Sequence, residues 1–145
     1  MTATISNAHA GHAFEHAVLQ FLSGTFPALE PNARVAIGIN GKKNHKFDLG
    51  DLKAKVVVEC KRHKWTAGGY VPSAKLSGWN EAMYLFHAAP KSYRKIFFAL
   101  RDYSKQRGMT LAEYYIKTYA HLIPKDVEIW EYDARSKTGT QVYPA

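Results

Sequence analysis

Apolar positions follow two different periods along this chain, and their order predicts an α/β protein. Apolar residues at helical spacing predict helices over residues 6–23 and 73–87. A capping box formed by Thr110 and Glu113 predicts a third helix that continues to about Leu122. Runs rich in β-branched or aromatic residues predict strands, whose ranges are 34–39, 46–49, 55–60, 95–100 and 127–132.

The first two helices each carry one apolar stripe that should face a core. The stripes comprise Phe14, Ala17, Val18, Phe21 and Leu22 in the first helix, and Leu76, Trp79, Met83 and Phe86 in the second. Glu15 lies one residue off the first stripe, at the border between core and solvent. That position suits either a site residue or an ordinary surface glutamate.

Turn signals between the strands favour a mixed sheet. Asn40-Gly41 is a hairpin signal between the first two strands, and Gly50 opens a turn to the third. We therefore expect a three-stranded antiparallel meander followed by helix, strand, helix and strand. The expected fold is α/β: a mixed central β-sheet, made of the meander plus two further strands, with helices on both faces. Residues 1–145 should form a single domain.

The charge of the chain bears on its partner. Lys and Arg number 20 against 12 Asp and Glu, a net charge of +8. This excess favours nucleic acid as the partner, with an anionic membrane second and simple solubility as the plain alternative. One cysteine allows no internal disulfide and favours a reducing, cytoplasmic compartment. We expect no membrane contact, because no apolar run approaches the roughly 18 residues of a membrane span.

The candidate chemistry lies where the second and third predicted strands end. Asp48 is near the end of the second strand, and Glu59 and Lys61 follow the valine run of the third. Side chains alternate along a strand, so Glu59 and Lys61 leave one face and Cys60 leaves the other. A turn through Gly50 would bring Asp48 beside Glu59. Such carboxylates, together with substrate phosphates, are the ligands that Mg²⁺ prefers.

These residues carry a resemblance to a known family. Asp48, an eleven-residue step to Glu59, and then Glu59-Cys60-Lys61 resemble the motif of the PD-(D/E)XK nuclease superfamily, which has the restriction-endonuclease-like fold. The preceding helix offers Glu15 where that family carries another acid. Phe47 stands where the family often has proline. By order of elements the resemblance covers residues 10–133.

The resemblance implies a Mg²⁺-dependent hydrolysis of phosphodiester bonds, with Mn²⁺ as a substitute. Asp48 and Glu59 would ligate the metal, with the Cys60 carbonyl as a third oxygen. Glu15 would bind through water or help to hold a second ion, and one metal or two remain open. Lys61 would position the attacking water or stabilise the phosphate charge. The expected activity is a DNA endonuclease, either structure-selective or restriction-like.

Basic residues around these acids are candidates for contact with nucleic acid, DNA more than RNA. They are Lys42, Lys43, His45, Arg62, His63, Lys64 and Lys75. The loop 64–72 contains Gly68-Gly69 flanked by Trp65 and Tyr70. It reads either as a mobile flap whose rings stack on bases, or as a connector with its aromatics in the core.

Other functions fit parts of the pattern. A non-catalytic nucleic-acid-binding module of the same fold is one, a toxin-type nuclease acting on DNA or tRNA is another, and a basic structural subunit is a third. His12 and His16 could bind Zn²⁺ from one helix face, but Glu15 is in the wrong slot for the His-Glu-x-x-His signature. Cutting both strands of a duplex would call for a homodimer.

Overall fold

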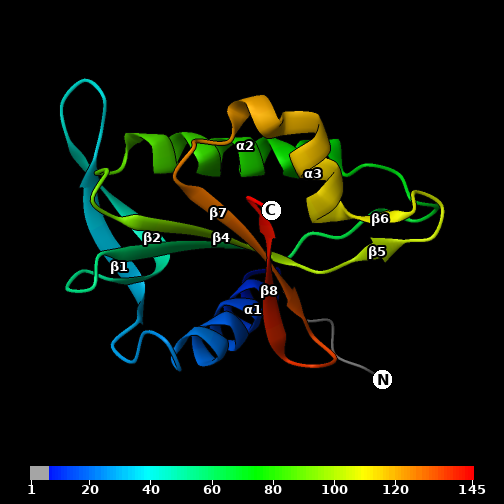
Figure 1. The fold of residues 1–145 in the computed structure, drawn as a ribbon, viewed down its shortest axis with the longest axis horizontal. Helices are drawn as coiled ribbons and strands as arrows, with labels where there is room; N and C mark the ends of the chain where they lie inside the picture. Colours follow the sequence, from blue (N-terminus) through cyan, green and yellow to red (C-terminus); the bar gives the residue numbers. More distant parts are fainter. Residues whose placement is uncertain (1–6) are drawn as a thin grey trace.

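The computed structural model describes residues 7–145, which form one central sheet with helices on both faces (Figure 1). The helices are α1 (Asn7–Leu22), α2 (Ser73–Ala88) and α3 (Leu111–Tyr119), which continues as the 3₁₀ turn η1 (Ala120–Leu122). The strands are β1 (Glu30–Ile37), β2 (Lys43–Asp51), β3 (Val56–Lys61), β4 (Arg94–Leu100), β5 (Tyr103–Ser104), β6 (Met109–Thr110), β7 (Val127–Asp133) and β8 (Thr138–Tyr143).

The central sheet has six strands in the order β1-β2-β3-β4-β7-β8. The first three form the expected antiparallel meander. β4 and β7 then add in parallel to β3, each after a helix, and β8 returns antiparallel at the edge. The carboxyl ends of β3, β4 and β7 therefore lie together at one end of the sheet. β5 and β6 form a separate short hairpin beyond that end (Figure 1).

Helix α1 covers one face of the sheet. Its residues Phe14, Val18 and Leu22 are buried, as the apolar stripe predicts, and they pack with buried residues such as Val58 and Phe98. The edge of the Phe14 ring meets Tyr132, with 6.0 Å between ring centroids. The predicted start of this helix at Ser6 lies outside the described residues.

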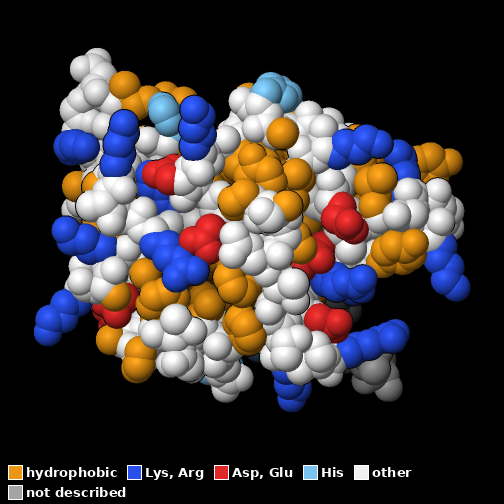
Figure 2. All heavy atoms as spheres, viewed as in Figure 1, with side chains coloured by type: hydrophobic (Ala, Val, Ile, Leu, Met, Phe, Trp, Pro, Cys, Tyr) orange, Lys and Arg blue, Asp and Glu red, His pale blue; other side chains and the backbone are white. Residues whose placement is uncertain are grey.

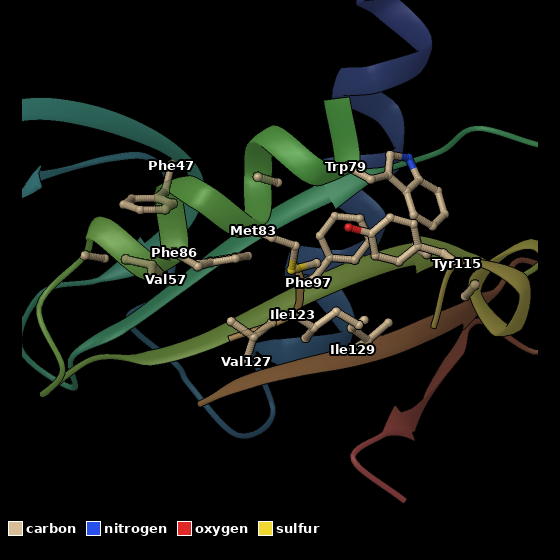
Figure 3. Packing of buried hydrophobic residues seen from close by; sticks show 14 of the residues in the cluster. Phe47, Val57, Trp79, Met83, Phe86, Phe97, Tyr115, Ile123, Val127 and Ile129 are labelled. Atoms are coloured by element: carbon tan, nitrogen blue, oxygen red, sulfur yellow. The ribbon is translucent and has the colours of Figure 1, made fainter. Parts of the chain in front are cut away.

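Helices α2 and α3 cover the opposite face. Trp79 of α2 lies 5.1 Å from the Phe97 ring of β4 and 5.1 Å from the Tyr115 ring of α3, measured between centroids. Figure 3 shows these three rings beside one another, with Met83 and Phe86 further along α2. The capping box of α3 is formed: Glu113 N–H donates to Thr110 Oγ1 at 3.1 Å, and Thr110 N–H donates to Glu113 Oε1 at 2.8 Å.

The sequence predicts two strands of the central sheet after the meander, but the structure has three: β4, β7 and β8. β8 escaped prediction because Thr-Gly-Thr-Gln-Val-Tyr is largely polar, and most of its residues face solvent or are only half-buried at the edge. The first strand was also misplaced, since β1 runs from Glu30 to Ile37 and leaves Ile39 exposed in the hairpin loop. None of the described helices is long and apolar enough to cross a bilayer.

Gly50 allows β2 to approach both of its neighbours just after Asp48. A Cβ atom at this position would lie 2.5 Å from the Ala33 Cβ of β1 and 3.0 Å from the Val56 carbonyl oxygen of β3. We expect Gly50→Ala to lower the free energy of unfolding by about 1–3 kcal/mol, since an extra methyl group strains a packed interior. Urea unfolding followed by circular dichroism measures this change.

Gly24→Ala is the matched control, because a Cβ there would lie 4.0 Å from its nearest neighbour, the Phe21 carbonyl oxygen. It should leave the unfolding midpoint nearly unchanged. Equal midpoints for both variants would show that the sheet accommodates the methyl group at position 50.

Candidate active site

An irregularity in β2 positions Asp48. Residues two apart in a regular strand share a face, yet Phe47 packs in the core under α2 and Leu49 packs in the core under α1. The β1–β2 register pairs Ala33 with Phe47 and Pro31 with Leu49 but includes no pair between them. The residue of β1 that is skipped, Asn32, has a left-handed backbone with φ of 59°. The alternation of side chains along β2 is therefore interrupted at Asp48, between Phe47 on one face of the sheet and Leu49 on the other.

The ladder between β2 and β3 also stops at this point. Its last pair is Leu49 with Val58, and two carboxylates occupy the place of the next pair. The Cys60 N–H donates to Asp48 Oδ2 at 2.8 Å, and the Asp48 N–H lies 3.4 Å from Glu59 Oε1. Each acid thus accepts from the backbone of the other strand, which satisfies donors left open where the strands separate.

Three acids from three elements influence one another through their charges here. Burial and then the charge of Glu59 raise the pKa of Asp48 to about 7, although the Cys60 N–H opposes the shift; Glu15 of α1 adds to it. Burial also raises the pKa of Glu15, with the charge of His12 opposing and that of Glu59 adding. The site therefore concentrates negative charge that its own lysine only partly offsets.

Lys61 leaves β3 on the same face as Glu59, toward α2. A Cβ atom built on Gly78 of α2 would lie 3.7 Å from Lys61 Nζ, so this glycine leaves room for the ammonium group. Both residues line a cavity of about 130 Å³, together with Glu59 and Glu81. His45 of β2 reaches the same cavity, where its Nε2 lies 3.4 Å from Glu59 Oε1.

Cys60 projects to the opposite face, as its place in the alternation predicts. Its side chain is partly buried against the core under α1. Burial raises the pKa of the thiol well above its ordinary value, and the charges of Asp48 and Glu15 add to this shift. A thiol with a raised pKa is a poor nucleophile, so Cys60 is a packing residue whose backbone serves the site.

A divalent cation fits the chemistry of this acidic group. Asp48 and Glu59 are brought together by the strand geometry, and the raised pKa of Asp48 reflects first its burial and then the charge of Glu59. The described residues contain no group of three or more His, Cys, Asp or Glu side chains placed to hold a metal. Mg²⁺ does not need one, because it is bound by one or two carboxylates with water and substrate phosphates completing its shell.

Apart from His45, which lies beside Glu59, the predicted nucleic-acid contacts divide into two groups. Arg62, His63, Lys64 and Lys75 line one cavity at the end of β3, beside the acids. Lys42 and Lys43 instead lie at the β1–β2 hairpin, which projects beyond the sheet (Figure 1). Gly38 of that hairpin donates to the carbonyl of Ala88, so the hairpin is attached to the far end of α2. The 16 residues of α2 separate the two groups by about 20 Å.

The cations are not confined to these two groups. Figure 2 shows Lys and Arg side chains scattered over the visible face, both near the β1–β2 end and near the β5–β6 hairpin. The charge pattern alone therefore does not define one binding strip, and the geometry at the end of β3 is the more specific signal.

The loop 64–72 is fixed to the domain rather than free. Arg107 donates from Nε to the Gly69 carbonyl at 2.8 Å, and its guanidinium lies 5.4 Å from the centre of the Trp65 ring. The backbone N–H of Trp65 donates to Asp102 Oδ2 at 2.8 Å. Trp65 packs against the core, while Tyr70 is 70% exposed. The connector reading is thus right for Trp65, and stacking of the Tyr70 ring on a base stays a prediction.

Several residues of this region were not among the predicted site residues. Gly78 and Glu81 stand off the apolar stripe of α2, and only the packing of α2 over β3 brings them to Lys61. Arg107 is 35 or more residues from the loop it holds. The helical wheel of α2 could have indicated Glu81, but no local pattern indicates Arg107.

We expect the stability of the protein to depend on pH through Asp48. Its pKa is raised in the folded state, so the folded chain keeps a proton that the unfolded chain has released between about pH 4 and pH 7. Stability should therefore fall as pH rises through this window. Asp48→Asn, which retains an acceptor for the Cys60 N–H, should be more stable than the wild type at pH 8 by about 1–2 kcal/mol and equal to it near pH 4.

Urea unfolding in EDTA across this pH range measures the effect. Glu30→Gln, at an exposed position of β1, is the control that removes a carboxylate elsewhere in the sheet. A variant Asp48→Asn that is less stable than the wild type at pH 8 would contradict the repulsion inferred for the site.

Arg107→Ala should release the loop 64–72. The lost hydrogen bond and ring contact are together worth about 1–2 kcal/mol, so chymotrypsin should cleave after Tyr70 about tenfold faster. Lys105→Ala, at an exposed position of the β5–β6 hairpin that also carries Arg107, should leave the rate unchanged. Mass spectrometry of the fragments over time measures the rate, and equal rates for both variants would show that other contacts hold the loop.

Comparisons with known proteins found no family model, no curated protein and no solved structure that matches this chain.

Proposed function

We propose that this protein is a Mg²⁺-dependent nuclease that hydrolyses phosphodiester bonds, with DNA as its expected substrate. One observation carries the proposal. Where the pairing of β2 with β3 stops, the carboxylates of Asp48 and Glu59 each accept from the backbone of the other strand, and Lys61 follows on the same face as Glu59. Two carboxylates and an ammonium group at one break in a sheet are suited to a cation and a phosphate.

The order of elements supports the same proposal. A helix with an acid, an antiparallel meander, a helix and a parallel strand occur in the order that the resemblance to the PD-(D/E)XK superfamily implies. The acids lie on the second and third strands of the meander, and Glu15 lies on the first helix. We propose a restriction-endonuclease-like fold on this basis.

The residues would divide the work as follows. Asp48 and Glu59 would hold the metal, with the Cys60 carbonyl as a further oxygen and Glu15 acting through water. Bound Mg²⁺ lowers the pKa of a coordinated water and offsets the charge on phosphate oxygens. Lys61, with its ammonium group in the space that Gly78 leaves open, would orient the attacking water or stabilise the charge that develops on the phosphate.

His45 has a supporting role in this proposal. Its Nε2 lies 3.4 Å from Glu59 Oε1, and its ring packs edge-on against Phe47 at 4.6 Å between centroids. The contact with Phe47 fixes the ring on the core under α2. His45 would therefore orient the Glu59 carboxylate as a positioning residue.

We expect the wild type to cleave at least one member of a substrate panel when Mg²⁺ or Mn²⁺ is present and none in EDTA. The panel is supercoiled plasmid, linear duplex, single strand, four-way junction and tRNA. Glu59→Gln and Lys61→Ala should each lower the rate about 100-fold or more, since each removes a group that acts on the reacting phosphate. Gel electrophoresis of the products measures the rates.

Two controls separate catalysis from folding and from binding. Lys117→Ala removes an exposed lysine of α3 and should retain wild-type activity. Mg²⁺ should raise the melting temperature of the wild type and not that of Glu59→Gln, because a ligand that binds only the folded state stabilises it. If every panel member binds in a salt-sensitive way and none is cleaved, the nuclease proposal is rejected in favour of a non-catalytic binding module.

A further inference from the structure

A cavity of about 510 Å³ adjoins the acidic group at the end of β3. Four of its lining residues are the cations Lys61, Arg62, Lys64 and Lys75, and none of the described lining residues is acidic. Its volume falls in the range of about 300–1,000 Å³ that is typical of ligand sites. Because Lys61 also lines the small cavity beside Glu59, the two spaces share a wall at the proposed catalytic lysine.

His63 gives this cavity a hydrogen-bond donor of fixed orientation. The indole Nε1–H of Trp79 donates to His63 Nδ1 at 3.1 Å. An Nδ1 that accepts must be unprotonated, so the ring proton is on Nε2. Trp79 is fully buried between Phe97 and Tyr115, which anchors the imidazole to the hydrophobic core.

The charges around His63 point to an anionic ligand. Burial lowers the pKa of His63, and the positive charges of Lys61, Lys75 and Arg62 lower it further. These cations are thus close enough to repel an additional proton, and an anion among them would relieve that repulsion. A terminal phosphate monoester carries about −1.5 to −2 charges near neutral pH, against −1 for an internal phosphodiester.

One wall of the cavity is formed by the connection between β3 and α2. Thr66 and Pro72, from the connection between β3 and α2, line it, and Gly11 of α1 contributes to it as well. Arg107 fixes that connection through the Gly69 carbonyl. One wall of the cavity is therefore fixed, and the higher charge of a phosphate monoester is what favours a chain end over a continuous strand.

We propose that this cavity binds a terminal phosphate of the nucleic acid, with Lys75 and Lys64 contacting its oxygens and His63 donating to it from Nε2. The inference rests on the proposed function for the identity of the ligand, and it deepens that function: the substrate would be a nucleic acid with a phosphorylated end beside the scissile bond. The shared chemistry is a phosphate monoester, which a 5′ end or a 3′ end can supply.

Isothermal titration of the whole protein in EDTA tests the proposal without any cleavage. The probes are the thymidine dinucleotide without a terminal phosphate, with a 5′-phosphate and with a 3′-phosphate. At least one phosphorylated form should bind about tenfold more tightly than the unphosphorylated one, since charge-assisted hydrogen bonds are the strong ones. Lys75→Ala should remove most of this preference, and Lys117→Ala should keep it. Equal affinities for the three probes would overturn the proposal.

A pair of His63 variants tests the role of the imidazole. His63→Gln keeps a donor near the position of Nε2, while His63→Asn keeps an acceptor near the position of Nδ1 for Trp79 but offers no donor to the cavity. The preference for a phosphorylated end should persist in His63→Gln and fall in His63→Asn. The reverse order would show that His63 only satisfies Trp79.

The outcomes for this cavity and for catalysis are separable. A preference for phosphorylated ends in a protein that cleaves nothing would retain the cavity assignment and reject the nuclease. Metal-dependent cleavage with no end preference in binding, and with equal rates on phosphorylated and dephosphorylated linear duplex, would retain the nuclease and reject the terminal-phosphate site.

Discussion

The candidate site depends on one hydrogen bond, in which the Cys60 N–H donates to Asp48 Oδ2 at 2.8 Å. In an uninterrupted antiparallel pair, the backbone of β2 would bond to the backbone of β3 here. Instead β2 pairs with β3 only from Leu49 onward, and the carboxylate of Asp48, just before the paired part, accepts from the Cys60 N–H. The same exchange brings Glu59 Oε1 toward the Asp48 N–H. The break in the ladder and the acidic pair are therefore one structural feature.

This arrangement concentrates like charges in a partly buried place, which opposes folding in the absence of a cation. The rest of the fold must supply the stability that the acids remove. Two cores, one on each face of the sheet, do so, and the buried Lys95 is paired with Asp126 at 2.7 Å where β4 begins. A destabilised group held by a well-packed scaffold is a common property of functional sites.

The basic cavity is attached to the same scaffold by different means. Trp79 presents its ring to Phe97 and Tyr115, and its N–H to His63, so one side chain belongs to both the core and the cavity wall. On the other side, Arg107 holds the loop 64–72 through the Gly69 carbonyl and the Trp65 ring. Rigid support of this kind keeps polar side chains in place for a ligand, and it reduces the entropy that binding would otherwise cost.

Local sequence patterns predict most of the elements and the acidic residues. The apolar stripes of α1 and α2, the valine run of β3 and the capping box at Thr110 are local patterns whose physical cause lies within one element, and the structure follows them. Alternation along β3 likewise placed Glu59 and Lys61 on one face and Cys60 on the other. β8 was missed because an edge strand with one exposed face needs little apolar sequence, and its pairing with β7 supplies what its composition lacks.

Which residues meet depends on the packing of the whole domain. The shift of faces at Asp48, the contact of His45 with Glu59, and the room that Gly78 leaves for Lys61 arise from strand register and from the packing of α2 on β3. Lys42 and Lys75 look equivalent as basic residues in the sequence, yet α2 holds them at opposite ends of its length. Distances between elements are set by the whole core, and a local pattern carries no record of them.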